Sequence, residues 1–381
     1  MRLGDLLVIK HGYAFSGENI VEEDNGIVLV TPGNFRIGGG FKEEKCKFFD
    51  GDIPADYILK EGDFIVTMTD LSKNIDTLGY CAMVPKSNRT YLHNQRIGLI
   101  TFKSNKCDSG YIYWLMRTHE YQRSIANTST GSTVHHTSPK KIYDFELELP
   151  PLCTQQRIAT ILSRYDSLIE NYQKQIKLLE EAAQRLYKEW FVDLRFPGYE
   201  NTPVVDGVPE GWEKKKLGEI TLIKTGKRDA NFGTTDGIYP FFTCSQEAIK
   251  APSYSFDTSA VILAGNGDFN VKLYRGKFEA YQRTYVIEAN NIDFLFLAYF
   301  CISKNIIKLK TGASGSTIKF LTKGMIESLD IWKPSENIIG LFNKVIEPMQ
   351  GQKESLQSQI RLLTEARDRL LPKLMSGEIE V

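Results

Sequence analysis

Two nearly identical helix-forming stretches, 184 positions apart (359 − 175), constrain this chain more than any other feature. They read QIKLLEEAAQRL (175–186) and QIRLLTEARDRL (359–370), and eight of the twelve paired letters are identical. An internal repeat bears on architecture first, because each repeated unit has to bury its apolar face against another unit. The chain is therefore predicted to consist of two related halves.

Apolar residues recur at heptad spacing through both stretches and well beyond them. From Thr154 to about Asp193 there is neither Gly nor Pro, and the apolar seam advances in alternating steps of four and three. This spacing predicts a paired helix of roughly 40 residues, about 60 Å long at about 1.5 Å per residue. The residues predicted to pack between the helices are Ile158, Leu162, Ile169, Ile176, Leu179, Leu186, Ile346, Leu356, Ile360, Leu363 and Leu370.

The second long helix is predicted from about Ser335 to Met375. Its seam keeps the register of the first helix, although Lys353 and Arg367 interrupt it. Pro348 and Gly351 weaken the first third of the helix, because proline removes a backbone donor and glycine costs conformational entropy. We expect a kink or a late start there.

The repeat continues outside the helices, with offsets that change along the chain. Three further pairs are LGDLLVIKHG and LGEITLIKTG (214, from 217 − 3), HNQRIGLI and AYQRTYVI (187, from 280 − 93), and GSTV and GSTI (184, from 315 − 131). Most of the length difference therefore falls between residues 12 and 93. A shared frame that carries two different sets of loops is predicted.

The segments before the helices contain short apolar runs broken by turn formers, which is typical of strands in mixed domains. An amphipathic helix over 109–126 interrupts the first segment, and its Tyr113, Leu115, Met116 and Ile125 are expected in the core. The fold class predicted is mixed α/β with a pseudo-twofold repeat. The expected boundaries are a first domain over 1–150, a helix over 151–195, a linker over 196–216, a second domain over 217–334 and a helix over 335–381.

Composition limits the functional classes. Lys plus Arg and Asp plus Glu both number 47, so the formal net charge is zero, whereas a protein that binds nucleic acid alone is usually basic. Six cysteines are scattered without a CxxC pair, which indicates reduced thiols and a cytoplasmic protein. No apolar run is long enough to span a membrane, and the first residues do not have the pattern of a signal peptide.

Helix pairing has a geometric consequence. Because each strand-rich domain precedes its helix, antiparallel pairing places the two domains at opposite ends of a rod. Roughly 55–60 Å of helix corresponds to about 16–18 base pairs of B-DNA, and twofold proteins commonly read two half-sites at a fixed spacing. Geometry alone leaves open a coiled coil used for dimerisation or scaffolding.

Several stretches resemble one known family. PPLCTQQRIATILSRYDSLIE (150–170) with LYKEWFVDLRFPGYE (186–200) is similar to the central conserved region of type I restriction–modification specificity subunits. LLPKLMSGEIEV (370–381) looks like their distal conserved region, and EGWEKKKLGEI (210–220) looks like the opening of a target recognition domain. The first repeat begins at Leu3 without an equivalent of Gly211-Trp212, so its domain is expected to lack an edge element or to borrow one.

The resemblance implies a non-catalytic subunit with two target recognition domains and two antiparallel helices. Each domain would read one half of an asymmetric bipartite target in double-stranded DNA, while the helices fix the unread spacer. Two adenine-N6 methyltransferase subunits would clamp the DNA, and two restriction subunits would add ATP-driven translocation and cleavage. Neutral charge is then expected, since the partner subunits share the phosphate contacts.

Motifs for chemistry are absent from the sequence. There is no phosphate-binding loop, no Asn/Asp-Pro-Pro-Tyr/Phe motif for a flipped adenine, and no convincing methyl-donor loop. Glu213 and Lys215 resemble half of a nuclease motif, and His135-His136 lack further ligands at metal spacing. No catalytic residue, cofactor or metal is therefore predicted.

Candidate DNA contacts fall into two groups. Gln95-Arg96 and Gln282-Arg283 recur in both halves, where they either contact bases or backbone or cap a strand of the shared frame. Sequence-specific contacts are expected instead in loops that differ between the halves, with phosphate contacts from basic and Gly-Ser-Thr segments. These candidates are Thr69, Lys73, Asn74, Ser132, Thr133, Lys140, Lys227, Arg228, Asn266, Asp268, Ser316, Thr317 and Lys319.

Two other functions compete with the DNA-specificity interpretation. The first is a coiled-coil scaffold whose two domains bind proteins and not DNA. The second is a free-standing modification enzyme, which the missing motifs disfavour.

Overall fold

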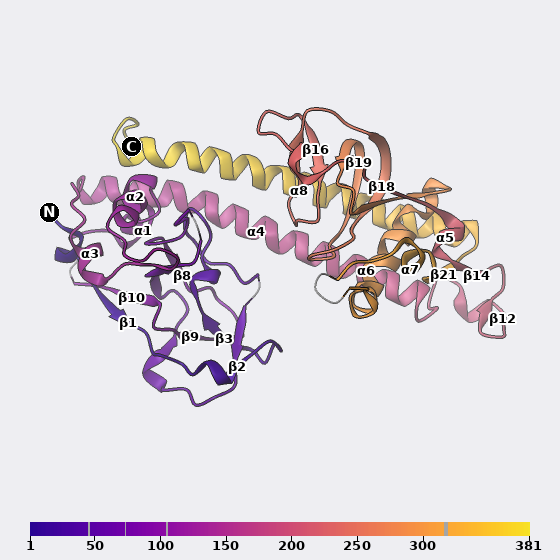
Figure 1. Ribbon diagram of the computed structural model, residues 1–381, viewed down its shortest axis with the longest axis horizontal. Helices are drawn as coiled ribbons and strands as arrows, with labels where there is room; N and C mark the ends of the chain where they lie inside the picture. The colour runs from indigo at the N-terminus through magenta and orange to yellow at the C-terminus, as the bar shows by residue number, and fades with distance from the viewer. Residues whose placement is uncertain (45, 73, 104–105, 316–318) are drawn as a thin grey trace. The chain divides into compact units, whose positions relative to one another are not determined.

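The computed structural model describes residues 1–381 except 45, 73, 104–105 and 316–318 (Figure 1). The chain divides into two compact units. Unit 1 comprises Met1–Asn171 and Gln359–Val381, and unit 2 comprises Tyr172–Ser358. Each of the two long helices therefore contributes one half to each unit.

The two long helices are α4 (Leu152–Phe191) and α8 (Glu336–Met375), each 40 residues long. Of the kink or late start expected for α8, the late start is wrong, because the helix runs continuously through Pro348 and Gly351. Both of these residues are exposed, so they lie on the solvent face of the helix. Ile346 and Leu356 on the opposite face are buried and pack against the rest of the unit. Tertiary packing here overrides local propensity.

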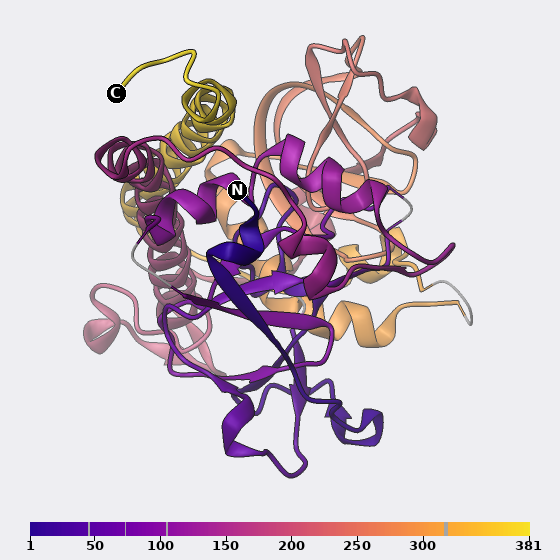
Figure 2. The ribbon, with the colours of Figure 1, turned by 90° about the vertical axis from the view of Figure 1, so that its left-hand side faces the viewer.

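Within unit 1, the first half of α4 and the last half of α8 lie side by side (Figure 1 and Figure 2). Arg367 Nη1 of α8 donates to Asp166 Oδ1 of α4 at 2.5 Å. Further towards the start of α4, Leu162 shares a buried cluster with Leu371, which lies further towards the end of α8. The two helices are therefore antiparallel in this unit, as the sequence predicts.

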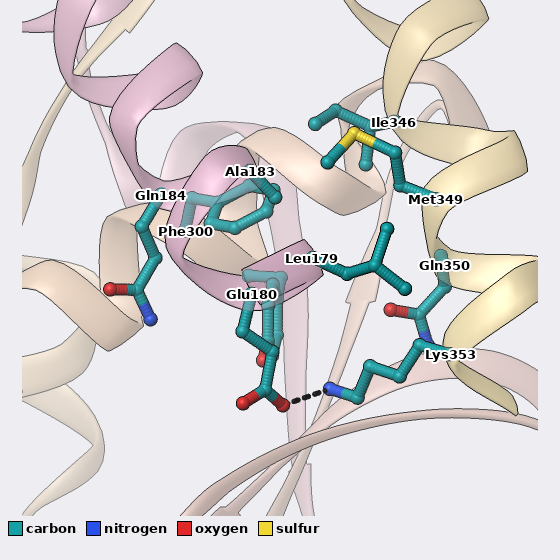
Figure 3. A pocket seen from close by; sticks show the side chains of 10 residues that line it. Leu179, Glu180, Ala183, Gln184, Phe300, Ile346, Met349, Gln350 and Lys353 are labelled. Atoms are coloured by element: carbon teal, nitrogen blue, oxygen red, sulfur yellow. Dashed lines mark ion pairs between the residues drawn. The ribbon is translucent and has the colours of Figure 1, made fainter. Parts of the chain in front are cut away.

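Within unit 2, the second half of α4 pairs with the first half of α8 in the same sense. Lys353 and Glu180 form the ion pair drawn in Figure 3, with Nζ 2.7 Å from Oε1, and the rings of Trp190 and Phe342 are 5.9 Å apart. Burial lowers the pKa of Lys353, but the facing Tyr299 and Glu180 outweigh it, so the pKa is raised. The lysine that interrupts the apolar seam is thus kept charged by a partner on the other helix.

Burial along the helices follows the heptad seam. Ile158, Leu162, Ile169, Ile346 and Leu356 are buried. The other residues predicted to pack between the helices are half-buried, namely Ile176, Leu179, Leu186, Ile360, Leu363 and Leu370.

Unit 1 contains two larger sheets. One sheet has the strand order β1-β10-β6-β8, and the other has the order β2-β4-β3-β9-β5. The strands are β1 (Leu7–His11), β2 (Ile20–Val21), β3 (Ile27–Val30), β4 (Lys47–Phe49), β5 (Ile58–Leu59), β6 (Phe64–Thr67), β7 (Thr69–Asp70), β8 (Cys81–Met83), β9 (Thr90–His93), β10 (Ile97–Phe102) and β11 (His135–His136). The short helices are α1 (Ser109–Leu115), α2 (His119–Asn127) and α3 (Pro139–Tyr143).

The single helix predicted over 109–126 is wrong, since α1 and α2 are separate. Thr118 starts α2 by accepting a hydrogen bond from the amide of Tyr121 at 3.2 Å. The break lets Arg117 turn inward, where its side chain is 4% exposed. The expected core residues Tyr113, Met116 and Ile125 are buried, and Leu115 is half-buried.

Unit 2 contains a sheet of strand order β15-β20-β18-β19-β16-β17. The strands of this unit are β12 (Val204–Val205), β13 (Val208–Pro209), β14 (Glu213–Lys216), β15 (Thr221–Thr225), β16 (Tyr239–Phe242), β17 (Ile249–Ala251), β18 (Phe256–Ala264), β19 (Val271–Ala280), β20 (Thr284–Ala289) and β21 (Asp330–Lys333). Its short helices are α5 (Leu217–Ile220), α6 (Leu295–Gly312) and α7 (Lys323–Glu327).

The segment 196–216, expected to be a linker, is an ordered part of unit 2. It forms the β12·β13 hairpin and then β14, which pairs with β21. The rings of Phe196 and Trp212 lie 4.7 Å apart, and both residues are buried. Its Pro and Gly residues shape turns between these short elements.

Strand pairing in the two units follows one register. Leu7 faces Phe102 in β1·β10, and Thr221 faces Ala289 in β15·β20. The partners are displaced by 214 (221 − 7) and 187 (289 − 102), which are two of the offsets found in the sequence. The repeated frame is therefore a repeated strand arrangement, and the halves differ in the loops between strands.

The start of the repeat also matches, with one difference. Arg2 forms an isolated bridge with Glu146, and the corresponding Lys216 faces Asp330 at one end of the β14·β21 pair. Unit 2 extends this bridge over four residue pairs, whereas in the described part of unit 1 it stays isolated. The expectation that the first domain lacks an edge element or borrows one stays a prediction.

Candidate DNA interface

In unit 1, the backbone of Met68 draws three separated segments together. Its amide donates to Arg96 O at 2.9 Å, and its carbonyl accepts from the amide of Thr137 at 3.0 Å. The chain continues from Met68 into β7, which pairs with β11. The loop that follows β7, the Gln95-Arg96 turn and the Gly-Ser-Thr segment therefore share one edge of the unit.

In unit 2, Gly265 holds the equivalent position. Its amide donates to Arg283 O at 2.8 Å, and its carbonyl accepts from the amide of Leu321 at 2.8 Å. A Cβ at Gly265 would lie 2.5 Å from Arg283 O, so only glycine fits this close approach. Asn266 forms a bridge with Phe320, which places the loop after Gly265 beside a residue that follows the second Gly-Ser-Thr segment in the sequence.

A fourth segment lies at each edge, where a glycine packs directly against the backbone of a neighbouring segment. A Cβ at Gly226 would lie 2.1 Å from Ala280 O, and a Cβ at Gly12 would lie 2.1 Å from Asn94 O. After Gly226, Arg228 forms a bridge with Tyr281. The basic loop TGKRDAN is therefore adjacent to Gln282-Arg283 in unit 2.

Most of the candidate side chains at these two edges are accessible. Gln95 and Arg96 are exposed although their backbone serves the frame, so the two interpretations of this turn are compatible. The other exposed candidates are Asn74, Ser132, Thr133, Lys140, Lys227, Arg228, Gln282, Arg283 and Lys319, while Asn266 and Asp268 are half-buried. Lys73, Ser316 and Thr317 lie outside the described residues.

Thr69 does not fit its predicted role as a DNA contact. Its side chain is 3% exposed, and its hydroxyl lies 3.1 Å from His136 Nδ1. Thr69 therefore joins β7 to β11 inside the frame and leaves His136 as the exposed member of the pair.

Two candidates in unit 2 have partners within the protein. Arg228 Nε lies 3.5 Å from Glu279 Oε2, and Glu279 is fully buried. The Arg228 guanidinium also lies 4.3 Å from the centre of the Phe232 ring. Gln282 Nε2 donates to Asp229 Oδ1 at 2.8 Å. These contacts hold the basic loop in place, so Lys227 is its more available cation for a phosphate.

Sequence reasoning missed Asp70, the best-connected polar side chain in the interface of unit 1. Its carboxylate accepts from the amide and hydroxyl of Thr77 at 2.6 and 2.8 Å, and from the amide of Ser72 at 2.6 Å. Burial raises the pKa of Asp70, but the hydrogen bonds from Ser72 and Thr77 outweigh it, so the pKa is lowered. The spacing Asp-x-Ser, which favours a side-chain-capped turn, is the signal that could have identified it.

Other kinds of site are not found in the described part of the chain. No group of three or more His, Cys, Asp or Glu residues there could hold a metal ion. None of the described helices is long and apolar enough to cross a membrane.

Comparison with known proteins bears on both units. A model of the type I restriction modification DNA specificity domain matches residues 1–181 and again residues 209–353. The two matches together cover more than half of the chain, and they coincide with the repeat.

Curated relatives carry the same description. The chain is 41% identical over 176 residues to the type I restriction enzyme EcoDI specificity subunit of Escherichia coli, a match that spans 45% of the chain and 39% of that subunit. It is 28% identical over 304 residues to the MjaIX specificity subunit of Methanocaldococcus jannaschii, which spans 72% of the chain and 69% of that subunit. The first match thus spans about two fifths of the relative's length.

A solved structure shows the same fold. The type I restriction–modification S subunit from M. genitalium aligns with a TM-score of 0.61 at 15% identity, covering 98% of the chain and 95% of that subunit. At this identity the likeness concerns the fold alone.

Proposed function

This chain belongs to the type I restriction modification DNA specificity domain family, and on that premise we propose that it is the sequence-specific DNA-binding subunit of a type I restriction–modification complex. Each unit reads one half of an asymmetric bipartite target. The observation that carries this proposal is the pair of equivalent edges at Met68 and Gly265, where one backbone frame presents two different loops. A shared frame with divergent loops suits two readers of different sequences.

The proposal also assigns a role to the rest of the chain. The helices α4 and α8 fix the length of the spacer between the two half-sites. Two adenine-N6 methyltransferase subunits and two restriction subunits carry out methylation, translocation and cleavage, and this chain contributes no catalytic group. The near-neutral charge supports such sharing, because other subunits then supply part of the phosphate contacts.

Deleting the gene in its host tests this function. We expect methyl-adenine to disappear from one asymmetric, gapped motif, and restoring the gene should restore it. Single-molecule methylome sequencing of the three strains measures this directly. In a host with an active cognate methyltransferase, unchanged methylation in the deletion strain would disprove the proposal.

Lengthening both helices tests the spacer role. We expect the insertion of four residues, about one helical turn, after Asn171 and again after Ser358 to lengthen the unread spacer while both half-sites stay the same. The insertions fall where the two units meet along the sequence, so the residues within each unit are unchanged. Methylome sequencing reports spacer and half-sites together, and altered half-sites with an unchanged spacer would show that the helices do not set the spacing.

A further inference from the structure

The loop after β7 in unit 1 is held by one buried side chain. Asp70 is 2% exposed, and it follows Met68, the residue that joins the interface segments, by two positions. A buried carboxylate is costly unless hydrogen bonds satisfy it. Asp70 accepts hydrogen bonds from both ends of the same loop. We call this loop the Asp70 loop (residues 71–72 and 74–77 among those described).

The two carboxylate oxygens of Asp70 accept hydrogen bonds from different ends of the loop. Oδ1 accepts from the amide of Ser72 at 2.6 Å, which fixes the start of the loop. Oδ2 accepts from the amide and hydroxyl of Thr77 and from the amide of Leu78 at 3.0 Å, which fixes its end. One carboxylate therefore closes the loop at its base.

A second anchor holds the middle of the loop. Ile75 has φ of 57°, in the left-handed region that β-branched residues rarely adopt. Its carbonyl accepts from Nε2 of Gln122 at 2.7 Å, and Gln122 is 6% exposed. The amide of Asp76 donates to the hydroxyl of Ser72 at 2.9 Å, which adds a bond across the loop. Uncommon conformations held in this way are concentrated at functional sites.

The loop presents accessible side chains. Asn74 is exposed, and Leu71 is 59% exposed although its neighbour Asp70 is almost fully buried. The loop is thus held by hydrogen bonds at its base and accessible at its surface. An apolar side chain in this setting can contact the C5 methyl group of thymine, which distinguishes thymine from cytosine in the major groove.

Unit 2 holds its equivalent loop in a different way. After Gly265, the loop is anchored by Asn270, whose Nδ2 donates to Cys244 O at 3.0 Å and to Ser245 O at 3.2 Å. Its apolar residue Phe269 is turned inward and is 6% exposed. The two units therefore differ in the anchor and in whether the apolar residue is exposed, at the place where their frames coincide.

Resting on the DNA-specificity function proposed above, we propose that Asp70 is the positioning residue of the base-reading loop in unit 1, and that Leu71 on this loop contacts a thymine methyl group in the half-site. Asp70 touches no base itself. It acts by fixing the path of the Asp70 loop against the frame.

The test replaces Asp70 by Asn in the full chain, co-expressed with its methyltransferase subunits. The amide has nearly the same shape, but its NH2 group has to face donors that the carboxylate accepts, so at least one end of the loop is released. We expect about tenfold weaker discrimination at one or more positions of a single half-site. The other half-site and the spacer should stay unchanged in the methylome.

Two variants serve as controls. Asp63→Asn alters a carboxylate that caps a turn elsewhere in unit 1 by accepting from the amide of Lys60 at 2.8 Å, and it should leave the motif unchanged. Thr77→Val removes the hydroxyl hydrogen bond from Thr77 to Asp70 at nearly constant shape, and it should relax the same half-site more mildly, even if Asp70→Asn fails to fold.

Leu71 is tested with purified complex and synthetic duplexes. Replacing the contacted thymine by deoxyuridine, which lacks the methyl group, should weaken binding by the wild-type complex several-fold and leave binding by a Leu71→Ala complex unaffected. If no thymine position in either half-site shows this coupling, the role of Leu71 is disproved.

The outcomes separate the two proposals. If the wild-type chain directs no gapped motif, the DNA-specificity function fails and the inference on Asp70 fails with it. If the wild-type chain does direct one, but Asp70→Asn keeps the same base preferences or lowers methylation uniformly, then Asp70 is only structural and the positioning role is overturned.

Discussion

Replacing Asp166 by Ala is expected to destabilise unit 1 by about 3–5 kcal/mol, since it removes the only carboxylate shared by two largely buried arginines among the described residues. Arg117 Nη1 donates to Asp166 Oδ2, and Arg367 Nη1 donates to Asp166 Oδ1, both at 2.5 Å. The arginine side chains are 4% and 15% exposed. Without Asp166, the almost fully buried Arg117 loses its carboxylate partner, while Arg367 keeps its pair with Asp368.

Arg117 makes this loss large because it connects several elements. Its guanidinium lies 4.2 Å from the centre of the Trp114 ring, and its Nε donates to Gly38 O at 2.9 Å. Burial lowers the pKa of Arg117, but the neighbouring Tyr113 and Asp166 outweigh burial, so the pKa is raised. Arg117 therefore stays charged, and Asp166 on α4 links it to Arg367 of α8.

Unit 2 offers a matched control for this prediction. Arg275 pairs with both carboxylate oxygens of Glu347 on α8, but the two side chains are 37% and 53% exposed. Glu347→Ala should therefore cost about 1 kcal/mol or less. Urea unfolding of the wild type and both variants measures the difference. If Asp166→Ala proved no more destabilising than Glu347→Ala, the buried cluster would not hold unit 1 together.

The helical part of this fold could be predicted from sequence because its signal is long and periodic. Heptad spacing over more than four repeats determines which residues face the partner helix. A single helix-breaking residue such as Pro348 does not outweigh it. The repeated frame could be inferred as well, since LGDLLVIKHG and LGEITLIKTG contain β1 and β15, which pair with equivalent strands in the two units. Local periodicity thus predicts the long helices, and repetition predicts the frame that the two units share.

The interface could be predicted only as separate segments. Their convergence depends on backbone hydrogen bonds at Met68 and Gly265, which link residues far apart in the chain and leave no pattern in any one window. Arg117 was hidden for a related reason, because a charged residue inside an amphipathic stretch is normally exposed. Asp70 is a single polar residue whose role depends on donors that the folded loop brings to it.

Exchange of one recognition region tests the central claim most directly. Residues 1–150 would be replaced by the first region of another family member, chosen to keep an arginine where Arg117 contacts Asp166 so that the exchanged part fits α4. We expect the methylome of the host to show a motif in which one half-site has changed completely, while the other half-site and the spacer are retained. If both half-sites changed together, or if neither changed, the account of two independent readers on one helical frame would be contradicted.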